Sequence, residues 1–149
     1  MSGPNRFALR LMWKSHRFWY RVSGGRIGTK IARLPILELT TTGRSSGQPR
    51  GVMLAYVSDP RGFVVIASNG GDERDPAWWR NLQAHPDATV REGRATHAVR
   101  MRRLEGDERD RAWQRAVAAY KGYAKYKDKT TRTIPVALLE KMPGGAPPA

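Results

Sequence analysis

Cysteine is absent from the 149 residues of this chain, which excludes disulfide bonds, thiolate nucleophiles and cysteine metal ligands. Only three histidines occur, His16, His85 and His97, and their separation gives none of the spacings that ligate zinc. The sequence also lacks the Gly-x-Ser-x-Gly elbow and the Gly-Lys-Ser/Thr phosphate loop, and few of its carboxylates are paired outside charged helix starts. A hydrolase and a metal site are therefore disfavoured, and an enzyme with this composition would need a bound cofactor to carry its chemistry.

Acidic residues are also scarce. The chain has 13 aspartates and glutamates against 27 lysines and arginines, so its formal net charge is +14. A field this positive attracts polyanions, which include phosphorylated cofactors, nucleic acid and the anionic surface of a membrane, and charge alone does not choose among them. The apolar runs are far shorter than the ~20 residues of a membrane span, and no secretory signal is present. A cytoplasmic protein is therefore predicted.

The chain is expected to form one domain with a short extension at each end. In a predicted helix over 6–22, basic residues recur every three or four positions and form one narrow stripe, at Arg6, Arg10, Lys14, Arg17 and Arg21. Such a helix can lie on the anionic inner face of the plasma membrane, or it can pack over the core with its arginines in water. The predicted divisions are a helix and linker over 1–30, the main domain over 31–141 and a disordered tail over 142–149.

Short runs of β-branched and apolar residues, separated by turn signals, predict about six strands. Hairpins are expected at Asp59-Pro60-Arg61-Gly62 and around Glu92-Gly93. The predicted strands cover 34–41, 52–57, 63–68, 88–91, 94–104 and 134–139.

Two further helices are predicted after the one over 6–22. In the first, Asp75 is expected at the N-cap and Pro76 at the first helical position, and His85-Pro86 ends the helix. The second begins at Gly106-Asp107 and ends in a tyrosine-rich segment up to residue 127. The fold class is therefore predicted as mainly β with three peripheral helices, a small closed or split β-barrel of mostly antiparallel strands.

The segment 40–50 places two glycines, several hydroxyls and two arginines between two predicted strands. Glycine lets backbone amides approach a ligand, consecutive turn amides can surround an anion, and arginine offers forked charged donors. Three or four charge-assisted hydrogen bonds of about 1.5–3 kcal/mol each would support micromolar binding, which needs about 8 kcal/mol. The segment predicts a cradle for a polyanionic small molecule, with an ordinary hairpin loop as the alternative. A second glycine loop, Asn69-Gly70-Gly71, can also bring backbone close to a ligand.

Four blocks of this sequence resemble, in order and spacing, the deazaflavin-dependent nitroreductase family. They are Leu39-Thr40-Thr41-Thr42-Gly43-Arg44-x-Ser46-Gly47-x-Pro49-Arg50, Ala67-Ser68-Asn69-Gly70-Gly71, Pro76-Ala77-Trp78-Trp79-x-Asn81-Leu82-x-Ala84-x-Pro86 and Thr131-x-Thr133-Ile134-Pro135. The resemblance implies a split β-barrel related to the oxidoreductases that bind flavin mononucleotide (FMN). It also implies coenzyme F420, a deazaflavin with a phosphate and a polyglutamate tail, as the cofactor.

The resemblance also implies roles for individual residues. The 44–50 loop would hold the phosphate and tail, residues 68–71 would approach the deazaflavin or its linker, and Trp78 and Trp79 would pack near the cofactor. Three tyrosines, Tyr120, Tyr123 and Tyr126, match positions on the substrate side, where one could donate a proton to the substrate. The cofactor-binding candidates are Thr42, Gly43, Arg44, Ser45, Ser46, Gly47, Gln48, Pro49, Arg50, Ala67, Ser68, Asn69, Gly70, Gly71 and Trp78.

The function that follows is hydride transfer from reduced F420 to an electron-poor small molecule, which could be a quinone, an enone or a nitro compound. Quinone reduction would suit a membrane-touching helix over 6–22, and a homodimer is also open. FMN is the alternative cofactor. Two other classes of protein remain open: a non-catalytic carrier of F420 or a fatty acyl ligand, and a basic nucleic-acid-binding domain without a recognition motif.

Overall fold

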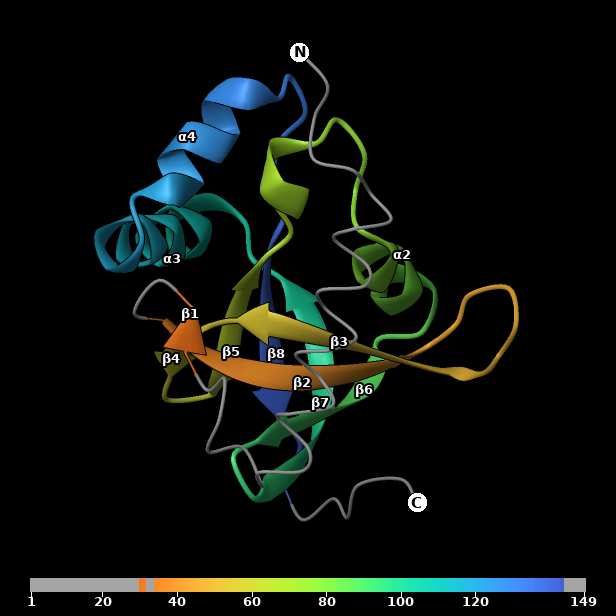
Figure 1. Cartoon of the computed structure of the whole chain (residues 1–149). Helices are drawn as coiled ribbons and strands as arrows, with labels where there is room; N and C mark the ends of the chain where they lie inside the picture. The colour runs from red at the N-terminus through yellow and green to blue at the C-terminus, as the bar shows by residue number, and fades with distance from the viewer. Residues whose placement is uncertain (1–29, 32–33, 144–149) are drawn as a thin grey trace.

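The computed structural model describes residues 30–31 and 34–143, and most of its elements are strands of one eight-stranded sheet (Figure 1). The strands are β1 (Lys30–Ile31), β2 (Leu34–Thr42), β3 (Pro49–Ala55), β4 (Val57–Asp59), β5 (Gly62–Ile66), β6 (Asp87–Glu92), β7 (Ala95–Arg103) and β8 (Val136–Lys141). The helices of the described residues are the 3-10 turn η1 (Asn69–Gly71) and the α-helices α2 (Ala77–Ala84), α3 (Gly106–Ala119) and α4 (Gly122–Lys129).

The sheet curls because the two ends of its pairing order are neighbours in the chain. The strands pair antiparallel in the order β2, β6, β7, β8, β5 and β4, and β3 pairs with the other side of β2. Only Tyr56 separates β3 at one end of this order from β4 at the other end. The sheet must therefore bend until its ends meet, and Figure 1 shows the resulting half-barrel. The predicted mainly β split barrel is confirmed.

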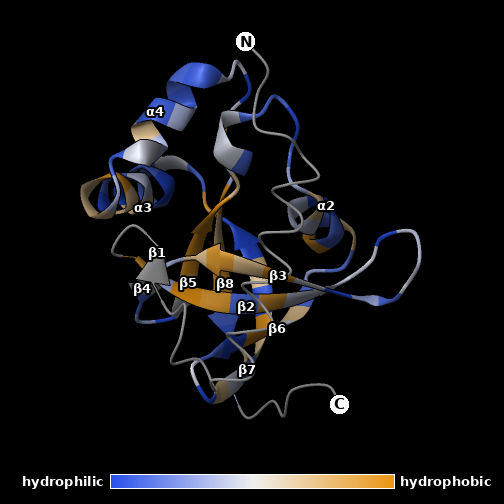
Figure 2. Cartoon of the chain, in the orientation of Figure 1, coloured by the Kyte–Doolittle hydropathy of each residue, from blue (hydrophilic) through white to orange (hydrophobic). Residues whose placement is uncertain are grey.

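Both faces of β5 and β8 are buried, which explains their unbroken apolar runs. Phe63 and Val65 of β5 belong to the cluster inside the barrel, whereas Val64 and Ile66 belong to a second cluster under α3 and α4. This division follows the two-residue period of a strand. Figure 2 shows the consequence, with apolar residues along the strands and polar residues on the outer turns of the helices.

The structure divides one predicted strand into two. The segment 52–57 was expected to be continuous, but Tyr56 interrupts it, and the amide of Tyr56 donates to the carbonyl of Pro35. The chain leaves β3 at this point and enters β4, which pairs with β5. The predicted hairpins at 59–62 and around Gly93 are confirmed, since they join β4 to β5 and β6 to β7.

The helices depart from prediction in two places. Asp75 is not the N-cap of α2; Pro76 occupies that position, and the Asp75 carboxylate instead pairs with Arg132 at 3.0 Å. The tyrosine-rich segment is also a separate helix, α4, rather than the end of α3. A β-carbon at Gly122 would lie 2.3 Å from the ring of Tyr120, so this ring occupies the space beside the glycine where the helix breaks.

Two predictions concern residues outside the described ranges: the basic helix over 6–22 and most of the tail over 142–149. The predicted division near residue 30 likewise stays a prediction. In the described residues, no helix combines the length and the apolar character that crossing a bilayer requires.

Candidate functional site

The loop between β2 and β3 is closed by its own backbone. Thr42 and Pro49 pair across the hairpin, the Gly43 amide donates to the Gln48 carbonyl at 2.8 Å, and the Gly47 amide donates to the Gly43 carbonyl at 2.8 Å. Gly47 has a φ of +70°, and a β-carbon at Gly43 would lie 2.5 Å from Ser46 Oγ. Gly47 therefore suits the left-handed backbone of this loop, and a side chain at Gly43 would displace the Ser46 hydroxyl.

The donors that remain available in this loop are fewer than a fully open amide cradle would offer. Besides Gly43 and Gly47, the amide of Gln48 is also occupied, because it donates to Ser46 Oγ at 3.2 Å. Within the described residues, the amides of Ser45 and Ser46 have no acceptor. The arginine side chains are exposed, and Arg50 Nη2 lies 3.4 Å from Ser46 Oγ. The loop thus offers an anion two guanidinium groups, hydroxyls and two adjacent amides.

A buried asparagine that sequence reasoning did not single out for function holds this loop to α2. Asn81 is 4% exposed, and its Oδ1 accepts from the Arg44 amide at 3.1 Å and from Arg44 Nη1 at 2.9 Å. Its Nδ2 donates to Thr41 Oγ1 at 3.1 Å. The available signal was a polar residue at helical spacing between Trp78 and Leu82, on the buried face of α2. Asn81 therefore fixes the orientation of the Arg44 backbone and side chain relative to α2.

The second glycine loop has an unusual backbone. Asn69, Gly70 and Gly71 all have positive φ, at 47°, 65° and 86°. Ala67 and Ser68, which precede them, are buried. A β-carbon at Gly71 would lie 3.0 Å from Lys129 Cβ, so α4 packs directly on this turn. The loop consequently brings its backbone beside the helix that carries Tyr123 and Tyr126.

Arg132, which lies inside the fourth motif block but was not assigned a role, holds the second loop. Its Nη2 donates to the carbonyls of Ala67 at 3.0 Å and Ser68 at 2.9 Å, and its Nε donates to the Asp72 carbonyl at 3.0 Å. Its Nη1 pairs with the Asp75 carboxylate. No local sequence signal predicts these contacts, because the partners lie 57 to 65 residues away in the chain.

The three tyrosines form one cluster beside this loop. The ring centroids of Tyr120 and Tyr123 lie 5.2 Å apart, and Tyr126 lies 6.2 Å from each of them. Tyr123 is buried in the core, whereas the hydroxyls of Tyr120 and Tyr126 lie 3.2 Å apart. Burial raises the pKa of Tyr123 to about 12, and the hydrogen bond with Tyr120 raises the pKa of Tyr126 to about 12. Both phenols are therefore protonated at neutral pH.

The two tryptophans of α2 close one end of the barrel. Trp78 and Trp79 are 8% and 2% exposed, and both belong to the cluster inside the barrel. Their rings meet edge to face with centroids 6.4 Å apart. This packing fixes α2, which begins soon after the second glycine loop and carries Asn81 under the first loop.

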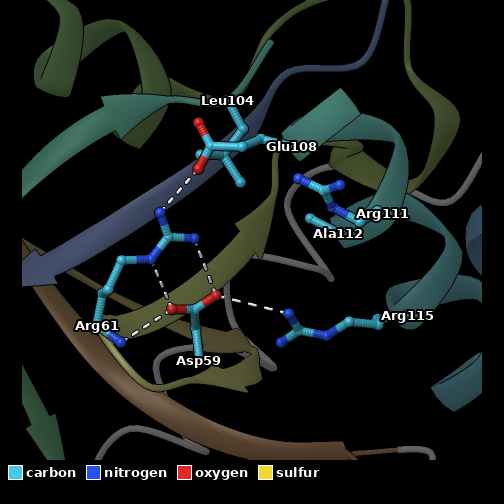
Figure 3. Close-up of a pocket in the computed structure, with 7 residues that line it drawn as sticks. All are labelled: Asp59, Arg61, Leu104, Glu108, Arg111, Ala112 and Arg115. Carbon is cyan, nitrogen blue, oxygen red and sulfur yellow. Dashed lines mark hydrogen bonds and ion pairs between the residues drawn. The ribbon is translucent and has the colours of Figure 1, made fainter. Parts of the chain in front are cut away.

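A separate polar hollow lies where α3 meets the β4–β5 hairpin, and Figure 1 shows that region at the opposite end of β2 from the 43–48 loop. A chain of ion pairs crosses it, from Arg115 to Asp59, Arg61 and Glu108 (Figure 3). Glu108 also pairs with Arg102 at 2.9 Å. The two carboxylates already accept from these arginines, so the ion pairs hold α3 against the hairpin. The hollow measures about 260 Å3 and is lined by Asp59, Arg61, Leu104, Glu108, Arg111, Ala112 and Arg115.

This chain of ion pairs predicts a loss of stability in acid. Hydrogen bonds from Arg61 lower the pKa of Asp59 from 3.8 to about 2, and hydrogen bonds from Arg102 and Arg61 lower the pKa of Glu108 from 4.5 to about 2. Because both folded pKa values are depressed, the stabilisation is complete above about pH 5 and disappears as the pH falls toward 2. Urea unfolding between about pH 2 and pH 5 should show this fall, and it should be shallower in Asp59→Asn. Identical slopes in the variant and the wild type would contradict this assignment.

Comparison with known proteins agrees with the fold and identifies the family. A family model described as F420H(2)-dependent quinone reductase matches residues 12–141. The F420H(2)-dependent quinone reductase Rv1261c of Mycobacterium tuberculosis (strain ATCC 25618 / H37Rv) is 36% identical over 130 residues, which cover 85% of this chain and 87% of that protein.

Two solved structures are similar to this chain at comparable identity. An F420-H2 dependent reductase (FDR-A) has a TM-score of 0.66 and 42% identity, over 71% of this chain and 94% of that one. A structure described as a domain-swapped dimer has a TM-score of 0.68 and 38% identity, over 85% of this chain and 94% of that one. The chain therefore belongs to the F420H(2)-dependent quinone reductase family and is an oxidoreductase that takes coenzyme F420.

Proposed function

We propose that this reductase binds F420 across the 43–50 and 67–72 loops and passes hydride from the reduced cofactor to a quinone. The observation that carries this proposal is the pair of donor-rich loops connected by one helix. Helix α2 follows the second loop, and its Asn81 hydrogen-bonds Arg44 of the first loop. One rigid element thus positions both candidate contact surfaces.

The residues present fit this cofactor chemically. F420 carries a phosphate and several carboxylates, and the first loop offers Arg44, Arg50 and the amides of Ser45 and Ser46. No acidic residue interrupts the segment 39–58. In the second loop, Gly70 is exposed and has open space beside it, so no side chain there would hold a ring or linker away from the backbone. The donors therefore match a ligand that is anionic at one end and flat at the other.

When bound, reduced F420 supplies a hydride for the two-electron reduction of the acceptor. The chain's contribution is to hold the two reactants close and in a fixed orientation, which can lower a barrier by ~7–11 kcal/mol. The protein can also provide a hydrogen bond to the acceptor oxygen as negative charge develops there. Tyr120 and Tyr126 suit that task better than Tyr123, because Tyr123 is 7% exposed and packs in the core.

Tyr126→Phe is expected to lower kcat for quinone reduction by up to about tenfold, the effect of one neutral hydrogen bond of about 0.5–1.5 kcal/mol. Because the pKa of Tyr126 is raised to about 12, its proton stays bound below that pH, and this group should cause no fall in activity between about pH 6 and pH 10. Steady-state turnover of a water-soluble quinone measures both effects. An unchanged kcat in Tyr126→Phe and in Tyr120→Phe would remove these two tyrosines from the reaction.

The identity of the hydride acceptor is tested by comparing turnover with three classes of compound. Purified protein and reduced F420 are given a quinone, an enone and a nitroaromatic compound, and cofactor oxidation is followed by absorbance. The proposal expects the highest kcat/KM with the quinone. A higher kcat/KM with the enone or nitro compound would reassign the substrate, and F420 binding without any turnover would favour the carrier alternative.

We also propose that the basic segment 6–22 brings the reductase to an anionic membrane, where quinones dissolve, and that the chain forms a homodimer. The spacing of the arginines supports the first idea. The relative described as a domain-swapped dimer supports the second. Co-sedimentation with anionic vesicles that survives replacement of the five basic stripe residues by glutamine would contradict the membrane role. A monomeric mass by light scattering would contradict the dimer.

A further inference from the structure

Arg132 uses every nitrogen of its side chain, and two of them, Nε and Nη2, donate to backbone carbonyls of the 67–72 loop. Nη2 is shared by the carbonyls of Ala67 and Ser68, Nε donates to the Asp72 carbonyl, and Nη1 pairs with Asp75. The side chain is 14% exposed, so these contacts are largely shielded from water. Three hydrogen bonds from one planar guanidinium fix both ends of the segment 67–72 relative to each other, and the fourth contact ties the guanidinium to Asp75.

These contacts also set the direction of two peptide groups. The described chain has no cis peptide, and in a trans peptide the N–H points opposite to the C=O. Since the carbonyls of Ala67 and Ser68 point at Arg132, the amides of Ser68 and Asn69 point away from it. Within the described residues neither amide has an acceptor. The side of the loop away from Arg132 therefore presents free donors.

The segment cannot take this conformation from local preference alone. Three successive residues with positive φ include Asn69, for which the left-handed region is costly compared with glycine. Few local hydrogen bonds compensate: Gly71 and Asp72 donate back to Ser68 and Asn69, and Asn69 Nδ2 donates to the Arg74 carbonyl. Further support comes from Arg132, from the packing of α4 on Gly71, and from the contact of Glu73 with Thr131, whose amide and hydroxyl lie 3.1 and 3.0 Å from the carboxylate.

We infer that Arg132 is a positioning residue for the cofactor: it fixes the 67–72 loop so that the amides of Ser68 and Asn69 face F420. The inference rests on the proposed function, because it takes this loop as part of the F420 site. The ligand atom is an oxygen that accepts from the backbone, either a ring carbonyl or a phosphate oxygen. Arg132 itself lies behind the loop and need not touch the cofactor.

The test compares Arg132→Met with Arg109→Met. Methionine keeps the length of the side chain and removes its donors in both variants. Arg109 is a matched control because its Nη2 donates at 2.7 Å to the carbonyl of Ile134, two residues from Arg132, and has no contact with the loop. The readouts are the Kd for F420, the unfolding free energy, and the amide resonances of Ser68 and Asn69 in nitrogen-15 NMR spectra.

The expected results are specific to the loop. In the wild type, F420 should shift the Ser68 and Asn69 amide resonances and slow their hydrogen exchange. Arg132→Met should raise the Kd at least about tenfold and Arg109→Met less than about twofold. Arg132→Lys should recover part of the affinity, and it replaces Arg132→Met if the methionine variant does not fold.

A second ligand distinguishes the two candidate oxygens. The same Kd series is measured with the free deazaflavin, which lacks the phosphate and the tail. A loss of affinity for both ligands indicates a ring oxygen, and a loss for F420 alone indicates a phosphate oxygen.

Three outcomes would overturn the inference, and they differ in whether they also contradict the proposed function. A folded Arg132→Met protein that binds F420 as tightly as the wild type contradicts the positioning role and leaves the proposed function intact. So does a wild type in which F420 leaves the Ser68 and Asn69 amides unchanged. A wild type that binds no F420 contradicts the proposed function as well.

Discussion

Replacing both Arg44 and Arg50 by alanine is expected to weaken F420 binding by about 10²- to 10⁴-fold. Each guanidinium can make charge-assisted hydrogen bonds to the phosphate or carboxylates, and each such bond contributes about 1.5–3 kcal/mol. Losing one bond from each arginine costs about 3–6 kcal/mol, and every 1.4 kcal/mol is a factor of about ten. The measurement is a titration of each variant with F420, followed by tryptophan fluorescence.

The control for this prediction removes the same charge elsewhere. Arg94 and Arg100 are exposed on the β6–β7 hairpin, and Arg100 pairs only with Asp87 among the described residues. The Arg94→Ala/Arg100→Ala variant therefore loses two positive charges without touching the loop. Its affinity should fall only slightly, because long-range attraction is screened within about 10 Å at 0.1 M salt. Equal losses in the two double variants would mean that the overall field of the protein, rather than the 43–50 loop, holds the cofactor.

Trp79→Ala is expected to lower the unfolding free energy by about 3–5 kcal/mol, the usual cost of truncating a buried tryptophan. Trp79 is 2% exposed, meets Trp78 edge to face, and has the Arg103 guanidinium 6.0 Å from its ring centroid. Removing it opens a cavity at the end of the barrel that α2 closes. Because α2 also carries Asn81, F420 affinity should fall as well, even though Trp79 need not contact the cofactor.

Trp113→Ala on α3 is the control for the tryptophan prediction. Trp113 is half-buried, and its ring lies 5.6 Å from the Arg109 guanidinium rather than inside the barrel. Urea unfolding should show a smaller loss of stability in this variant, with little change in F420 affinity. If the two variants lost the same amount of stability, the packing of α2 against the end of the barrel would not be what stabilises it.

Strand alternation and turn residues predicted the sheet because these signals are local. The run after Gly62 and the hairpin at Glu92-Gly93 appear in the structure as β5 and as the β6–β7 turn. The order of the four motif blocks predicted the family, which the family model and the similar structures confirm. The individual site residues inside those blocks stay predictions, and the variants above test them.

The contacts that organise the site could not be predicted from the sequence, because they join distant residues. Asn81 reaches Thr41 across 40 residues, and Arg132 reaches Ala67 across 65. Within its own segment, Asn81 is only a polar residue on a helix, and Arg132 is only a charged residue in a loop. Neither position indicates its distant partner. The break between α3 and α4 is local by contrast, since the ring of Tyr120 packs against Gly122 two residues later.

The most direct test of the account is to titrate the wild-type protein with F420 and, separately, with FMN in about 0.15 M salt, where weak charge attraction is screened. The five tryptophans of the chain provide the fluorescence signal. We expect saturable F420 binding with a Kd of about 1 μM or tighter and much weaker FMN binding. Binding of FMN alone, or of neither cofactor, would contradict the assignment of the two loops to F420.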